Sequence, residues 1–475
     1  MLTFDRYFRF TDRGTTARTE MRGGLATFFT MAYIVVLNPL ILSGATDKLG
    51  RHLPLAQVAT STALVAAVMT LAMGIFGRYP FALAAGLGIN GVVAFSLAPQ
   101  MSWPAAMGIV VLEGLAITVL VVTGFREAVF DAIPMALKQA ISVGIGLFIA
   151  FIGFVDAGFV RRSGADPVPV SLGPNGRLIG WPSVVFCFGL LLTGLLVARR
   201  TKAAILIGIV STTVFAMVVN ALFDVPPQVV GGKFVNPGGW GLNVPKFPHK
   251  FVSSPDFGLV GHFSLTGGVK AVGVVSTILL VYTLMLADFF DTMGTVVGVG
   301  AEGGLLDEKG RLPGLGRVLL VDSLAAVAGG ATSSSSATTY IESAAGVADG
   351  ARSGLAAIVT GGLFVVALFF TPLVEVVPYE AASPALVVVG FLLMTQVRHI
   401  PWEDYDIAFP AFLTIVLRPF TYSITNGIGA GFIAYTTIKL FRGRSRQVHW
   451  MMWIVTASFL IYFAIDPVER LLGVH

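Results

Sequence analysis

The sequence contains little charge and almost no cysteine. Only 12% of its 475 residues are Asp, Glu, Lys or Arg, and Cys187 is the single cysteine. One cysteine excludes a disulfide within the chain and any cluster of cysteine ligands around a metal. Redox chemistry is therefore not supported, and so few charged residues cannot cover the surface of a soluble protein of this size.

Histidine is also scarce, and its positions exclude two further kinds of chemistry. The chain has six His residues, and they fall outside 272–299 and 338–347, the apolar segments that carry the candidate acids. A histidine proton relay or a zinc site would need histidines beside those acids. We therefore expect no metal and no cofactor.

Apolar residues are abundant instead. They make up 55% of the chain, and the mean hydropathy is +0.83. Because a membrane-spanning helix needs roughly 20 mostly apolar residues, the composition predicts an all-α polytopic membrane protein with about fourteen transmembrane segments. Apolar segments are expected near residues 26–44, 57–77, 84–97, 104–124, 134–155, 181–198, 203–222, 272–299, 316–331, 338–347, 354–376, 384–396, 405–417, 424–441 and 449–466.

The basic residues indicate topology rather than nucleic-acid binding. The net charge is +5, but Lys and Arg are scattered over short loops instead of gathered on one soluble face. With the N-terminal arginines inside, most of the other basic residues also fall inside, which follows the positive-inside rule. We expect a multi-pass protein of the cytoplasmic (inner) membrane that contacts lipid and binds no nucleic acid.

A long Gly- and Pro-rich stretch divides the apolar segments into two sets of about seven, and an odd number per set requires the two halves to insert with opposite orientation. The predicted organisation is a first inverted repeat over 1–223, an external linker over 224–271, and a second inverted repeat over 272–441. A C-terminal region, 442–475, carries an extra apolar helix.

The eighth apolar segment contains an acidic pair. Asp288 and Asp291 stand three positions apart in the middle of residues 272–299. An ionisable side chain near the bilayer centre costs about 2.5 to 3.5 kcal/mol on insertion scales, so it usually faces a water-filled path or a polar ligand. For Asp291, a bond to a neighbouring helix is an equally good interpretation.

Two segments are interrupted at corresponding positions of the two halves. In the third, Gly86 and Gly88 precede the polar Asn90, and in the tenth a run of hydroxyl residues, 332–339, leads to the acid Glu342. Broken segments in matching positions indicate a binding site at the membrane midplane. Helices that begin beside such breaks offer free N–H groups.

Three stretches of the chain resemble a known family. Ala84 to Gly91, Ala287 to Thr295 and Thr339 to Val347 are similar to the AzgA-like branch of the nucleobase:cation symporter-2 purine permeases. The resemblance implies a core domain (segments 1–4 and 8–11) and a gate domain (5–7 and 12–14) in an elevator-like alternating-access mechanism. It also implies proton-coupled uptake of adenine, guanine or hypoxanthine. Ala85 and Gly91 depart from the family, which commonly has Pro and Ala there.

The same resemblance assigns the predicted site residues. Asn90, Asp288 and Glu342 match the family's polar residues in the third, eighth and tenth segments, and Asp288 or Glu342 would carry the coupled proton. A purine is a flat ring with donors and acceptors on its edge, which suits carboxylate and amide partners. Thr339 and Phe289 complete the predicted substrate-binding set, and Phe290 and Tyr340 are further candidates for an aromatic wall.

Rival functions remain open at this point. A transporter of uracil or xanthine fits the same pattern, whereas an anion transporter is disfavoured by paired acids on Coulomb grounds. A membrane prenyl transferase would use an Asp-x-x-Asp motif such as Asp288 to Asp291 to hold Mg²⁺ diphosphate, but no second such motif lies in an apolar segment. We therefore expect a transporter and not an enzyme. The preferred purine, a homodimeric assembly and the membrane crossing of residues 449–466 are left undecided.

Overall fold

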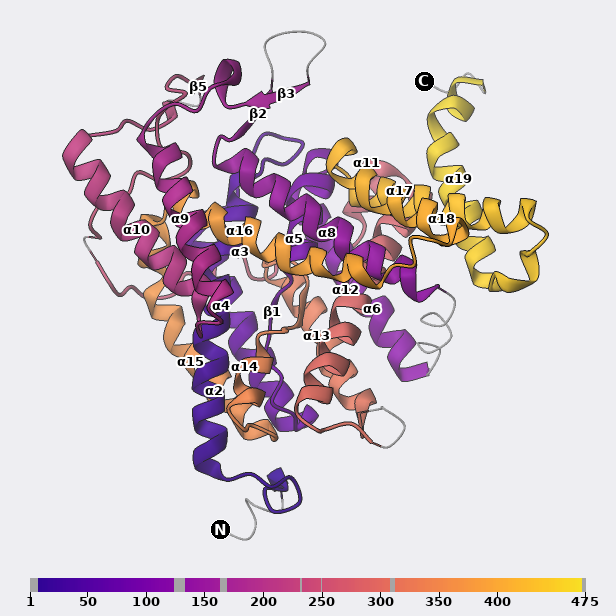
Figure 1. Cartoon of the computed structure of the whole chain (residues 1–475), viewed down its shortest axis with the longest axis horizontal. Coiled ribbons are helices and arrows are strands. Elements are labelled where there is room, and N and C mark those ends of the chain that lie inside the picture. Colours follow the sequence, from indigo (N-terminus) through magenta and orange to yellow (C-terminus); the bar gives the residue numbers. More distant parts are fainter. Residues whose placement is uncertain are drawn as a thin grey trace.

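The computed structural model describes residues 7–123, 133–162, 169–230, 233–248, 250–307 and 312–471. Over these residues the regular secondary structure is helical except for three short antiparallel ribbons (Figure 1). The ribbons pair β1 (Leu83–Ala85) with β6 (Ala337–Thr339), β2 (Val160–Arg162) with β3 (Val170–Leu172), and β4 (Val229–Val230) with β5 (Lys233–Phe234).

Among the described residues, eight helical stretches are long and apolar enough to cross a membrane. They are Ala17–Gly44, Leu55–Gly77, Trp103–Thr123, Met135–Asp156, Trp181–Ala198, Ala204–Phe223, Gly354–Val376 and Tyr379–His399. Shorter apolar helices cover Val274–Phe289 and Trp450–Ala464. The structure is thus that of an all-helical, multi-pass membrane protein, while the larger number of about fourteen segments stays a prediction.

The packing of the helices sorts them into two groups. In the first group α6 packs against α13 and α12, α15 against α4 and α2, and α14 against α2. The first group comprises α2 (Ala17–Met31), α3 (Ile34–Gly44), α4 (Leu55–Ala72), α5 (Leu87–Val92), α6 (Trp103–Thr123), α12 (Val274–Glu302), α13 (Leu315–Ala331), α14 (Ser343–Ala348) and α15 (Gly354–Ala367).

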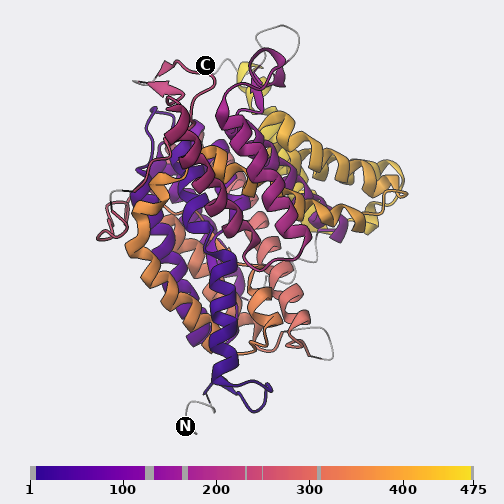
Figure 2. The ribbon, with the colours of Figure 1, turned by 60° about the vertical axis from the view of Figure 1, so that its left-hand side comes forward.

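In the second group α8 packs against α16 and α17, α9 against α10 and α16, and α17 against α18. Its members are α8 (Met135–Asp156), α9 (Trp181–Ala198), α10 (Ala204–Phe223), α16 (Tyr379–Met394), α17 (Tyr405–Thr421) and α18 (Ile424–Phe441). The remaining helices are α11 (Gly267–Val272) and α19 (Trp450–Leu471), and α19 lies against α18 and α12. Figures 1 and 2 place α17 to α19, orange to yellow, on one flank, away from the indigo α2.

The third and tenth apolar segments are not continuous helices. β1 and β6 pair between them, with Leu83 opposite Thr339 and Ala85 opposite Ala337. Each strand leads into a short helix, α5 or α14. Ser333 and Ser335 adopt left-handed backbone conformations (φ 59° and 69°), which turns the chain between α13 and β6.

Neighbouring side chains complete the hydrogen bonding of these strands. The hydroxyl of Thr70 in α4 accepts a hydrogen bond from the amide of Leu83 (2.9 Å) and donates one to its carbonyl (3.0 Å). The hydroxyl of Ser343 accepts from the amide of Ala82 (3.0 Å). Irregular backbone at membrane depth requires such partners, because no water is there to replace them.

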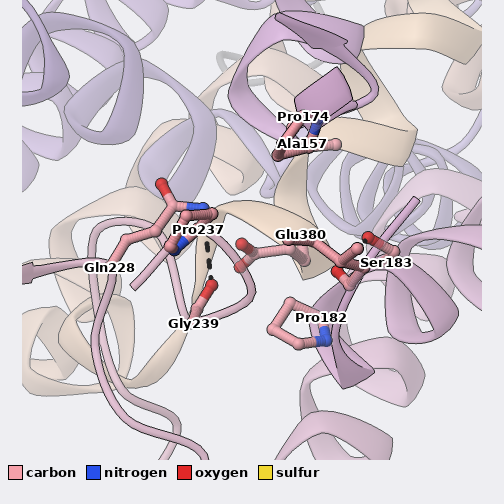
Figure 3. Close-up of a pocket in the computed structure, with 10 residues that line it drawn as sticks. Ala157, Pro174, Pro182, Ser183, Gln228, Pro237, Gly239 and Glu380 are labelled. Carbon is pink, nitrogen blue, oxygen red and sulfur yellow. Dashed lines mark hydrogen bonds between the residues drawn. The ribbon is translucent and has the colours of Figure 1, made fainter. Parts of the chain in front are cut away.

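The predicted linker folds back onto the second group. The indole of Trp240 donates to Asn220 in α10 (2.9 Å), and the amide of Gly241 donates to Glu380 in α16 (3.1 Å). Figure 3 shows the Glu380 side chain beside Gln228 and Gly239, which share a hydrogen bond of 3.4 Å. A cavity of about 10 Å³ at this place has room for about one water molecule.

The backbones of α8 and α16 come close together inside the second group. A Cβ atom added at Gly390 would lie 2.4 Å from the carbonyl oxygen of Gly146 and 2.8 Å from the Cβ of Ala150. Glycine is thus required where the two backbones meet. By contrast, nothing lies within 4 Å of a Cβ added at the exposed Gly362 in α15.

We expect Gly390→Ala to destabilise the protein by about 1 to 3 kcal/mol, because the methyl group forces α8 and α16 apart. Gly362→Ala is the matched control, and it should stabilise by up to about 1 kcal/mol because alanine is the better helix former. Melting temperatures of the two purified variants in detergent would measure the difference. A Gly390→Ala variant as stable as the parent would contradict the proposed contact.

A second prediction concerns the strand pair. Thr70→Val keeps the volume but removes both hydrogen bonds to Leu83, so it should lower the free energy of unfolding by about 1 to 3 kcal/mol. Thr70→Ser, which keeps the hydroxyl, should lose much less. Thermal unfolding in the same detergent tests this, and equal losses in the two variants would show that the hydroxyl is not what matters.

Candidate functional site

Acidic side chains from four elements of the first group meet beside the β1–β6 pair. They are Glu113 in α6, Asp288 and Asp291 in α12, Asp322 in α13, and Glu342 at the start of α14, and we call them the acidic cluster. Asp288 lies close enough to interact with Glu113, Asp322 and Asp291, and Asp291 with Glu342 and Asp322. Two of the three predicted polar site residues, Asp288 and Glu342, thus belong to one cluster.

The acidic cluster has a closed end and an open end. Glu113 and Asp288 are fully buried, and Asp322 is only 3% exposed. Glu342 is half-buried and Asp291 is exposed. Asp291 and Glu342 are therefore the more accessible carboxylates of the cluster.

Hydroxyl groups of the surrounding elements orient most of these carboxylates. Tyr33, between α2 and α3, donates to Glu342. Ser336 donates to Asp288 (3.4 Å) and Thr338 to Asp291 (3.3 Å). The hydroxyl run of residues 332–339 is thus part of the site and not only a polar loop.

Asp322 has the most complete set of donors in the cluster. Its carboxylate accepts hydrogen bonds from the amide and hydroxyl of Thr339 (2.9 and 2.8 Å) and from the hydroxyl of Thr292 (2.8 Å). Asp322 therefore ties α12 and β6 to α13. The hydroxyl of Thr339, predicted to bind substrate, is already engaged by this carboxylate.

Asn90 lies in α5 and is fully buried, yet neither its amide nitrogen nor its carbonyl oxygen has a hydrogen-bond partner among the described residues. A buried, unpartnered amide is rare in native structures, and a bound ligand is one of the few explanations for it. Gly91 beside it faces Ile152 and Phe148 of α8 at 3.6 Å from an added Cβ, so the Ala common in the family would fit.

The aromatic candidates differ in their surroundings. Phe289 is 5% exposed and follows Asp288 in α12. The hydroxyl of Tyr340 donates to the carbonyl of Ala85 (2.6 Å), which fixes its ring across the interrupted segments. The side chain of Phe290 lies outside the described residues. The assignment of Phe289 to a ligand wall stays a prediction.

Sequence reasoning missed three contributors to this site. Glu113 had no assigned role, and Asp322 was not selected although it is an acid in an apolar segment and meets the criterion applied to Asp288. Tyr33 gave no local signal, because its partner Glu342 lies 309 positions away. In the described part of the chain, no group of His, Cys, Asp or Glu has an arrangement that could hold a metal ion.

Solved structures with a similar fold are membrane transporters. The transmembrane domain of a cyanobacterium bicarbonate transporter, BicA, superposes with a TM-score of 0.59 at 13% identity, covering 87% of this chain and 97% of that one. Murine Solute Carrier 26 family member A9, an anion transporter in the inward-facing state, gives a TM-score of 0.56 at 12% identity and covers 89% and 68%. At such low identity the likeness establishes the fold alone.

Sequence comparison identifies the family. The Permease family model matches residues 18–463. The guanine/hypoxanthine permease PbuG of Bacillus subtilis is 38% identical over 462 residues, which covers 96% of this chain and 98% of PbuG. The adenine permease AdeQ of Escherichia coli is 33% identical and covers 97% and 96%. The protein is a multi-pass cell membrane protein, and it belongs to the permease family, within the nucleobase:cation symporter-2 purine permeases.

Proposed function

We propose that the protein takes up a purine nucleobase, adenine, guanine or hypoxanthine, together with protons across the cytoplasmic membrane. The family and the similar proteins are permeases, and those with assigned substrates include guanine/hypoxanthine and adenine permeases. Nucleobase transport is thus supported by likeness over nearly the full chain. Proton coupling and the mechanism rest on the site itself.

The observation that carries the proposal is the buried Asn90 amide, which has no hydrogen-bond partner among the described residues, in a helix (α5) that contacts α12, the helix that carries Asp288 and Asp291. A purine edge presents N–H donors and ring-nitrogen acceptors side by side. Carboxylates of Asp288, Asp291 and Glu342 accept from the donors, whereas the Asn90 amide both donates and accepts. Desolvating so many polar groups is costly unless the ligand restores their hydrogen bonds.

The two helix groups fit an alternating-access mechanism. The acidic cluster and Asn90 belong to the first group, which we assign as the transporting core, and the second group as the gate. The groups meet at contacts such as α5 with α8 and α12 with α8, where Gly88 and Gly91 face α8. We propose that the core slides along the gate in an elevator-like movement, with about seven segments in each inverted repeat.

An anion transporter is the second candidate, because the two similar folds described above belong to a bicarbonate transporter and an anion transporter. The acidic cluster opposes this reading, since an anion there would be repelled by every neighbouring carboxylate. Among the described residues the only buried Arg is Arg418, which donates to the carbonyl of Ile141 in the second group. A neutral base is therefore the better ligand for this site.

Uptake of radiolabelled adenine, guanine and hypoxanthine into cells without their own purine permeases tests the proposal. Asp288→Asn and Glu342→Gln should each weaken uptake at least tenfold, because a charge-assisted hydrogen bond contributes about 1.5 to 3 kcal/mol. A protonophore should abolish accumulation by the parent protein.

Asp12→Asn and Glu375→Gln are matched controls, because both residues are exposed. These two variants should transport like the parent protein. If the correctly inserted parent takes up none of the three purines, the purine assignment is wrong, and uracil, xanthine or an anion becomes the next substrate to measure.

Asn90→Leu separates ligand binding from stability. The substitution removes a buried amide that has no hydrogen-bond partner in the described ranges, so the ligand-free protein should melt at the same or a higher temperature. The upward shift of melting temperature caused by the preferred purine should disappear. A variant that keeps this ligand-induced shift would exclude Asn90 from the site.

A further inference from the structure

Glu113 is a buried acid that the purine-binding scheme does not use. It lies in α6 with no exposed surface, and neither of its carboxylate oxygens accepts a hydrogen bond from the described residues. Asp288, its neighbour in α12, is equally buried. One oxygen of Asp288 accepts the long bond from Ser336, and the other has no hydrogen-bond partner within the described part of the chain.

The packing of α6 brings Glu113 to this place. A Cβ added at Gly114 would lie 2.6 Å from the amide of Val327, and one at Gly330 would lie 2.8 Å from the amide of Val111. The backbones of α6 and α13 therefore touch on both sides of Glu113. Just beyond α13 the chain reaches Ser336, which donates to Asp288 (3.4 Å) and lies near Glu113.

Two ionised carboxylates are a poor fit for this environment. Burial costs each charge several kcal/mol, and two like charges sharing a site repel, so that one of them holds a proton. Within the described residues, no ion pair includes either acid. The other titratable groups facing them, Asp322 and Asp291, are acids too and add to the repulsion.

A single proton would supply what the pair lacks. As carboxylates, Glu113 and Asp288 are acceptors only, and the few donors around them are hydroxyls. When one acid is protonated, its O–H can donate to the other, and the pair carries one charge instead of two. Asp322 is different, because Thr292 and Thr339 already stabilise its ionised form.

We propose that Glu113 and Asp288 form a proton-binding pair, and that the proton it holds is the one carried with the nucleobase. The inference rests on the proposed function and names the place of coupling within it. One proton enters the pair from outside as the base binds, and the same proton leaves to the inside as the base is released. No bond of the base is made or broken. Asp288 links the two ligands, because it belongs both to the pair and to the predicted base site, and Glu113 acts through Asp288.

Purified protein in liposomes, with labelled purine and a pH-sensitive dye inside, tests the pair. Glu113→Gln cannot release a proton, so accumulation driven by a pH gradient should fall at least tenfold more than counterflow, the exchange of labelled for unlabelled base without a gradient. Glu375→Gln, an exposed acid outside the site, should leave both unchanged. Equal losses in both modes, or proton-driven accumulation like that of the parent, would overturn the proposal.

Glu113→Asp keeps the carboxyl group but moves it away from Asp288, because the Asp side chain is one methylene shorter. This variant replaces Glu113→Gln in the test if the Gln variant does not fold. It should shift the pH profile of uptake while its largest counterflow rate stays within about threefold of the parent. An unchanged profile would reject the pair. Failure of the purine assignment looks different, because the parent protein would then show neither accumulation nor counterflow of any purine.

Discussion

The rest of the structure depends on the hydrogen bonding of the backbone where the third and tenth apolar segments stop being helical. At that depth an unpaired N–H or C=O costs several kcal/mol. β1 and β6 satisfy part of the demand by pairing with each other. Side chains satisfy more of it: the hydroxyl of Thr70 bonds Leu83, and the carboxylate of Asp322 accepts from the amide of Thr339.

The need to satisfy this backbone also determines how many hydrogen bonds each acid of the cluster accepts. Asp322 serves the backbone and two hydroxyls, so its charge is spread over three hydrogen bonds and is stable in a buried place. From the residues that the structure describes, Asp288 accepts one long hydrogen bond and Glu113 accepts none. The carboxylates of one cluster therefore differ in the hydrogen-bond donors around them, and the strand pair and its neighbours bring those donors.

The sequence was sufficient for features that local composition determines. Glycines around Asn90 and hydroxyls before Glu342 predicted the two interruptions, and Asp288 stood out as a charge within an apolar run. It was not sufficient for partners that only the fold brings together. Tyr33 reaches Glu342 across 309 positions, and the engagement of Thr339 by Asp322 depends on how β6 meets α13. Length and hydropathy also do not decide how many segments span the membrane, because helices such as α13 and α17 have only 17 residues each.

Coupling between a proton and a base requires that each changes the affinity for the other by the same factor. A group that touched only one of the two ligands could not provide this link. Asp288 faces Glu113 in the closed end of the cluster, and Asp291, one helical turn further along α12, lies at its open end. A purine N–H and the proton shared with Glu113 would both bind to the Asp288 carboxylate. They would compete if they used the same oxygen of Asp288, and they would cooperate if they used different oxygens. The helix α12 thus carries carboxylates assigned to both ligands, and the proposed movement of the core would carry the proton and the base across the membrane together.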